Sequence, residues 1–115
     1  MLVMARDIAA ATKGDTVLCQ VLQHVKSGWP EEVDDERLRP FFSKRWELTM
    51  ERDCLLWGWR VVIPDPLHGQ ILEELHVAHP SIVRMKEITR SHVWWPKIDS
   101  DIEATVRQCG SCQET

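Results

Sequence analysis

Two pairs of metal-binding residue types constrain this chain more than any other feature of its sequence. His76 and His79 form an H-x2-H pair, and 29 residues separate them from the C-x2-C pair of Cys109 and Cys112. Two imidazoles and two thiolates make a closed tetrahedral donor set that suits structural zinc. The alternative for C-x2-C, a thioredoxin-like redox pair, opens a helix after a strand, whereas this pair follows a predicted helix. We therefore predict one structural zinc ion with these four ligands.

A zinc ion would also stabilise the second part of the chain, which is short for a domain. Residues 66–115 number only 50, which is near the length at which a hydrophobic core alone gives marginal stability. A structural zinc contributes on the order of 10 kcal/mol to folding, and here it would join the end of one helix to the end of another. Because four protein ligands leave no open coordination position, and the sequence has no HExxH motif, a hydrolytic zinc enzyme is not expected.

The remaining cysteines and the other candidate histidines are interpreted as structural. Cys19 lies on a predicted helix and Cys54 in an apolar, strand-like run, and both are predicted to pack in the core as small apolar residues. His68 and His92 have no partner at ligand spacing. They are therefore not expected to bind the metal.

Apolar periodicity predicts an α+β chain that is mostly helical. Helices are predicted at 6–12 and 15–25, with Asp15 as the N-cap and Gly28 as the stop. A helical stretch over 35–45 is expected to bend or break at Pro40. Three short strands that form a small antiparallel region are predicted at 46–50, 54–57 and 59–63. Three helices are predicted to follow: one over 65–76, one that begins after Ser81 and is broken by the Trp-Trp-Pro run at 94–96, and one over 97–108. We divide the chain at Pro64 into regions 1–64 and 65–115.

Charge and hydropathy narrow the possible partners. The formal net charge of −4 excludes a polybasic nucleic-acid binder. No apolar run approaches the 18 to 20 residues of a membrane span, and the first residues lack a signal-peptide core, so an intracellular protein without a membrane partner is expected.

One stretch of the chain is nevertheless locally basic. Residues 82–97 hold four bases against the single acid Glu87, a local charge of +3. A phosphate-binding face would account for this excess, although a solvated helix face would look the same. The four bases are Arg84, Lys86, Arg90 and Lys97. Trp94 and Trp95 could stack on bases, but at least one of them is expected in the core.

Several motifs, taken in order, resemble a known family. LHVAHP at 75–80, RMK at 84–86, VWWP at 93–96 and CGSCQ at 109–113 are similar to the His-His-Cys-Cys zinc-binding domain of integrases. The likeness is closest to integrases of Gypsy-type long-terminal-repeat retrotransposons and genes derived from them. GWP at 28–30 and LLWG at 55–58 resemble the segment before that domain in the same polyproteins.

The resemblance implies a fold and a role. It implies a zinc-stabilised three-helix bundle, similar to helix-turn-helix modules, that supports integrase multimerisation and contacts element-end DNA during DNA integration. The expected partners are therefore element-end DNA and integrase subunits or further copies of the chain, in the nucleus, with no small-molecule substrate. The alternative is a protein–protein interaction domain of a domesticated retroelement gene, with no nucleic-acid role.

The resemblance also marks differences from the family. The family's catalytic core, with its Asp-Asp-Glu carboxylates, lies after the C-x2-C pair, and this sequence runs only to Thr115, so no enzymatic strand transfer is expected from these residues. Ser81 and Lys97 stand where the family commonly has glycine. Because glycine adopts positive φ at little cost, the turns at these two positions are where the backbone is expected to differ.

Overall fold

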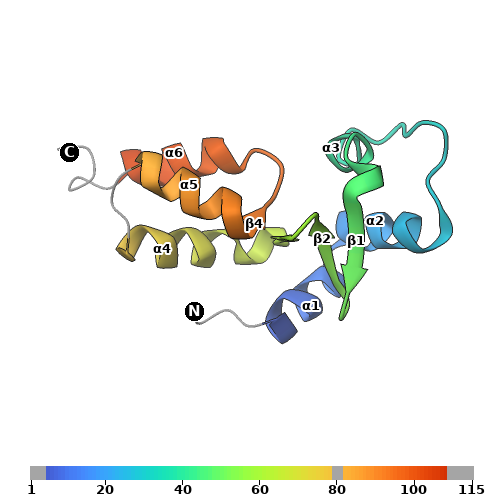
Figure 1. Ribbon diagram of the computed structural model, residues 1–115, viewed down its shortest axis with the longest axis horizontal. Helices are drawn as coiled ribbons and strands as arrows, with labels where there is room; N and C mark the ends of the chain where they lie inside the picture. The colour runs from blue at the N-terminus through green and yellow to red at the C-terminus, as the bar shows by residue number, and fades with distance from the viewer. Residues whose placement is uncertain (1–4, 79–81, 109–115) are drawn as a thin grey trace.

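The computed structural model of this protein describes residues 5–78 and 82–108. The molecule is elongated, with principal extents of 48 × 27 × 21 Å. Helices from the first half and most of the sheet lie at one end, and the three helices of the second half lie at the other (Figure 1). Within the described residues, no helix is long and apolar enough to cross a membrane.

The first two helices form where the sequence predicts, and each extends two residues beyond its predicted end. Helix α1 covers Ala5–Gly14 and helix α2 covers Thr16–Ser27. The carboxylate of Asp15 accepts hydrogen bonds from the backbone N–H groups of Val17 and Leu18, at 2.9 and 3.0 Å, and so caps α2. Gly28, with φ of +103°, ends the helix. Both the predicted cap and the predicted stop are confirmed.

The stretch predicted as a broken helix forms two short elements. Helix α3 covers Arg39–Phe42, and a 3₁₀ turn, η1, covers Arg45–Glu47. Pro40 lies in the first turn of α3, where its missing N–H costs no hydrogen bond. The proline therefore helps to begin a helix here rather than kinking one.

A four-stranded sheet occupies the middle of the chain. Strands β1 (Leu48–Glu51), β2 (Cys54–Trp57) and β3 (Arg60–Val62) are antiparallel, as predicted. The fourth strand, β4 (Val93–Trp94), pairs parallel with β3. The sequence predicted only the end of a helix at that point, so β4 is an addition to the predicted fold. A two-residue strand carries no periodicity that could reveal it.

The second half forms the three predicted helices. A 3₁₀ turn, η2 (Asp65–Leu67), leads into α4 (His68–Ala78), which is followed by α5 (Ile82–His92) and α6 (Ile98–Arg107). Lys97 precedes α6 in the left-handed conformation, with φ of 67° and ψ of 21°. Glycine would adopt this conformation without a Cβ clash, and Lys97 adopts it with its side chain in place. Ser81, the other position where the family has glycine, lies outside the described residues.

Two hydrophobic clusters stabilise the fold. The sheet cluster consists of residues between 18 and 62: Leu18, Val21, Leu22, Leu38, Phe41, Leu48, Leu55 and Val62. The bundle cluster lies among α4, α5 and α6 but also takes residues from the first half: Ile8, Cys54, Ile63, Ile71, Leu72, Met85, Val93, Trp95, Ile98, Ile102 and Val106. The predicted class, α+β and mostly helical, is confirmed, while the division at Pro64 stays a prediction.

Candidate metal centre

Helices α4 and α6 lead to the predicted zinc ligands. His76 lies in the last turn of α4, partly buried, and the helix ends at Ala78. Helix α6 ends at Arg107, two residues before Cys109. The two helix ends lie at the same end of the three-helix bundle (Figure 1). His79, Cys109 and Cys112 are outside the described residues, so the four-ligand set stays a prediction.

The side chains that fix this arrangement belong to the bundle cluster. Ile71 of α4, Met85 of α5 and Ile102 of α6 are each at most 1% exposed. Leu72 and Val106 extend the contact along α4 and α6. Burying large apolar side chains between helices contributes about 1.5 to 3 kcal/mol each. The cluster therefore holds α4 and α6 against each other up to the turns from which the ligands follow.

The chemistry of the donor set fits zinc. Within residues 5–78 and 82–108, no group of three or more His, Cys, Asp or Glu side chains could hold a metal ion. Of the four predicted donors, only His76 is among these residues. Two histidines and two cysteines provide the borderline-soft, fully coordinating set that structural zinc requires.

His68 is a structural residue, as expected. Its ring stacks on Trp95, with 4.0 Å between centroids and 12° between planes. Its Nε2 donates a hydrogen bond to the backbone carbonyl of Ile63 at 2.7 Å, and its Nδ1 lies 3.4 Å from a carboxylate oxygen of Asp65. Burial lowers the pKa of the imidazole. His68 thus joins the start of α4 to the end of the sheet.

The cysteines outside the predicted site differ from each other. Cys54 is buried, as predicted, and burial raises the pKa of its thiol. Cys19 is exposed, so the prediction that it packs in the core is wrong. The buried face of α2 is formed by Leu18, Val21 and Leu22, and position 19 is turned about 100° from Leu18. Its thiol instead donates to the carbonyl of Lys13 at 2.9 Å.

The predicted basic face is largely ion-paired. Arg84 lies 3.6 Å from Glu87, Lys86 lies 2.7 Å from Glu103, and Arg90 lies 2.9 Å from Asp99. The hydrogen bond from Lys86 lowers the pKa of Glu103. Among the described residues, Lys97 has no ion-pair partner within 4.0 Å. Because Asp99 and Glu103 follow the basic stretch in sequence, a local charge count over 82–97 omits them.

The tryptophans divide into buried and exposed groups. Trp95 is 1% exposed and belongs to the bundle cluster, which confirms the prediction that at least one of the Trp94–Trp95 pair lies in the core. Trp94 packs edge-on against Phe41 and Trp57. Trp46 and Trp59 are 82% and 70% exposed. The sequence did not mark these two as candidate binding residues. A signal that could have done so is that each is adjacent to an arginine in the sequence.

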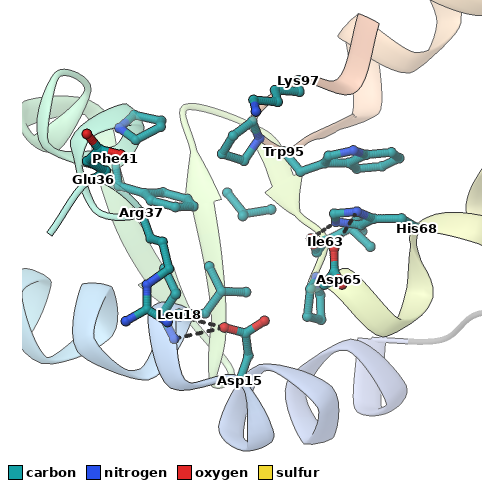
Figure 2. Close-up of a pocket in the computed structure, with 15 residues that line it drawn as sticks. Asp15, Leu18, Glu36, Arg37, Phe41, Ile63, Asp65, His68, Trp95 and Lys97 are labelled. Carbon is teal, nitrogen blue, oxygen red and sulfur yellow. Dashed lines mark hydrogen bonds and ion pairs between the residues drawn. The ribbon is translucent and has the colours of Figure 1, made fainter. Parts of the chain in front are cut away.

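A cleft of about 530 Å³ is a further feature that the sequence did not reveal. It lies between α2 and α3 on one side and the residues around η2 and Pro96 on the other (Figure 2). Its lining is mainly apolar, with Glu36, Arg37 and Lys97 among its charged residues. The lining comes from four separate segments, so no local motif could have identified it.

Comparison with known proteins finds a family whose model matches the second half of the chain. Residues 63–115 match the integrase zinc binding domain, a range that contains both the H-x2-H and the C-x2-C pair. A Caenorhabditis elegans protein, described only as uncharacterized, is 37% identical over 109 residues, which is 94% of this chain and 9% of that protein. The chain thus spans about a tenth of the curated relative it matches. No solved structure matches it.

Proposed function

We propose that this chain, whose residues 63–115 match the integrase zinc binding domain, is the non-catalytic zinc module of a Gypsy-type retroelement integrase. One structural zinc ion would be bound by His76, His79, Cys109 and Cys112. The observation that carries the proposal is the arrangement of α4 and α6, whose ends lead to the two ligand pairs at one end of the bundle (Figure 1). The residue types of the two pairs, two histidines and two cysteines, are those that bind structural zinc.

Zinc would act here as a structural cross-link. When bound, the ion holds four protein donors and leaves no position for substrate. Helices α4, α5 and α6 have only 11, 11 and 10 residues, and helices this short are marginal in isolation. Fixing the end of α4 to the segment after α6 would therefore stabilise the bundle without taking part in a reaction.

The bundle would contact element-end DNA and support assembly with integrase subunits or further copies of the chain, in the nucleus. Arg84 and Arg90 support the DNA contact because their side chains are 62% and 59% exposed. Ion pairs between exposed side chains contribute only about 0 to 1 kcal/mol, so a DNA phosphate can replace Glu87 or Asp99 as the partner. Lys97 extends the same charge at the start of α6.

Duplex binding across a salt series tests this proposal. We expect Arg84→Glu and Arg90→Glu to weaken binding of zinc-loaded protein to an element-end duplex. We also expect each to lower the slope of log K against log salt by about 1, because each removes a phosphate contact. Arg39→Glu is the matched control, since Arg39 is also exposed and close to an acid but lies in α3.

Equal duplex binding by the wild type and all three variants would contradict the DNA role. It would favour the alternative, a zinc-stabilised protein–protein interaction domain. Fluorescence anisotropy of a labelled duplex measures both affinity and salt slope in one experiment.

A further inference from the structure

A group of basic and aromatic residues lies at one end of the sheet. The backbone N–H of Gly58 donates to the carbonyl of Glu47 at 3.0 Å, which extends the β1–β2 ladder by one step. Trp46 and Trp59, which flank these two residues, therefore lie at the same end of the sheet, where β1 begins. We call the six residues gathered there the aromatic–cation surface: Lys44, Arg45, Trp46, Trp57, Trp59 and Arg60.

Each cation of this surface lies over an aromatic ring. The Arg45 guanidinium is 4.8 Å from the centre of the Trp46 ring, and the Arg60 guanidinium is 4.6 Å from the rings of both Trp57 and Trp59. The Lys44 ammonium is 4.2 Å from the Trp57 ring. In the described part of the chain, none of the three cations has a carboxylate within ion-pair distance, whereas Arg84, Lys86 and Arg90 each have one.

Two acids beside the surface each have a hydrogen-bond or ion-pair partner. A carboxylate oxygen of Glu47 accepts a hydrogen bond from the indole N–H of Trp57 at 3.0 Å. Asp99 pairs with Arg90 beside a hollow of about 190 Å³ that Trp57 and Arg60 also line. The surface thus has three cations against the one carboxylate of Glu47, a positive excess on a chain whose net charge is −4. Its charge complements a polyanion.

The exposed rings indicate which kind of polyanion fits. Trp46 and Trp59 are 82% and 70% exposed, although tryptophan is a large ring that folding normally buries. The indole N–H of Trp59 donates to the carbonyl of Ser91 at 2.9 Å, which holds the ring in place. Exposed rings beside cations are the platform on which unpaired bases stack, while their phosphates meet the charges. Bases within a duplex are stacked on each other and offer only their edges.

We propose that the aromatic–cation surface binds single-stranded nucleic acid. Trp46 and Trp59 stack on unpaired bases, and Lys44, Arg45 and Arg60 neutralise the adjoining phosphates. The surface belongs to residues 44–60 and uses none of the zinc ligands or of the bases proposed to contact duplex DNA. The proposal therefore stands independently of the function proposed for the zinc domain.

Fluorescence anisotropy with a labelled oligothymidylate of about 16 nucleotides tests the proposal on the full, zinc-loaded chain. We expect measurable, salt-sensitive binding, about tenfold weaker in Trp46→Ala and in Trp59→Ala because each loses a stacked base. Trp59→Phe keeps a ring and should retain most of the affinity. Trp46 donates no hydrogen bond in the described structure, so Trp46→Ala removes the ring without disturbing the fold.

Charge variants separate this surface from the zinc domain. Arg45→Gln and Arg60→Gln should weaken oligothymidylate binding and lower its salt slope, whereas Arg39→Gln, the matched control, should not. Arg84→Glu should leave it unchanged, because Arg84 does not line the hollow beside this surface. The proposal is overturned if the wild type does not bind oligothymidylate, or if both Trp→Ala variants bind it as tightly as the wild type does. Duplex binding that persists in that case leaves the proposed function standing.

Discussion

The sheet cluster draws all of its fully buried side chains from residues 18–62, whereas the bundle cluster combines three short helices with Ile8 and Cys54 from the other side of Pro64. In the sheet cluster, a layer of strands meets α2 and α3, and Leu55 and Val62 are 0% exposed. In the bundle cluster, α4, α5 and α6 surround Met85 and Ile102, which are equally buried.

The difference concerns what each half needs from outside itself. Hairpin-connected strands covered by helices can form a complete core from one continuous segment. Three helices of 10 or 11 residues bury too little surface alone, and here α1 and β2 supply part of the apolar surface they need. A zinc ion at the end of the bundle would supply the rest. The two halves should therefore respond differently to loss of metal, to core mutations and to changes in their turns.

Metal removal should have the largest effect. Chelation is expected to unfold α4–α6 while β1, β2 and α2 stay folded, because a structural zinc contributes on the order of 10 kcal/mol to the domain that it closes. Circular dichroism would show a loss of helix, and amide exchange would rise in residues 68–107 but stay slow in β1 and β2.

Two cysteine variants control for chelation. Cys112→Ser should reproduce its effect and lower the zinc content from one ion per chain. Cys19→Ser should change neither, because Cys19 is exposed and outside the predicted ligand set. Uniform unfolding of both halves, or none, would show that the contrast between the clusters is wrong.

Matched core substitutions should separate the clusters next. Leu55→Ala and Ile102→Ala each remove a side chain that is 0% exposed, and each should lower the free energy of unfolding by about 2 to 5 kcal/mol. Only Ile102→Ala should also weaken zinc binding, because metal binding is coupled to folding of the bundle. Competition with a chromogenic chelator measures the affinity. Equal weakening by Leu55→Ala would mean that the two clusters fold as one unit.

The turns should show the smallest effect. Gly28 adopts positive φ, and a Cβ built there would have no atom within 4 Å, so Gly28→Ala should destabilise the protein by about 1 kcal/mol through backbone conformation alone. Lys97 adopts the left-handed conformation without being glycine. Lys97→Gly should therefore raise the free energy of unfolding by up to about 1 kcal/mol. Thermal melts of the zinc-loaded variants measure both, and a destabilised Lys97→Gly would show that its side chain has a stabilising contact.

Much of the fold could be predicted because its signals are local. Asp15 caps α2 through N–H groups two and three residues away, and Gly28 ends the same helix. Strand β4 could not be predicted, since Val93 and Trp94 pair with Val61 and Val62 across two intervening helices. Position 19 was predicted wrongly for another reason. Cys19 is one residue away from the buried face of α2, and that single step around the helix leaves its side chain exposed.

The candidate site could be predicted only in part for the same reason. Ligand residue types and their spacing are visible in a sequence, and residues 63–115 match the integrase zinc binding domain. Charge partners are not visible, since Lys86 and Glu103 are 17 residues apart and meet only when α5 packs against α6. Trp46 and Trp59 are exposed because they lie at the end of the sheet. Composition alone could therefore not distinguish them from buried tryptophans.

The parallel pairing of β3 with β4 has a consequence for the order of folding. The β1–β2–β3 meander needs only short loops to close, so it can form early. Strand β4 can join it only after α4 and α5 have brought residue 93 back beside residue 61, which requires a much longer loop to close. We expect the edge of the sheet to be completed late, together with the bundle. The amide of Ile63, which donates to the carbonyl of Trp94 at 3.1 Å, should then gain protection from exchange at the rate at which the bundle folds.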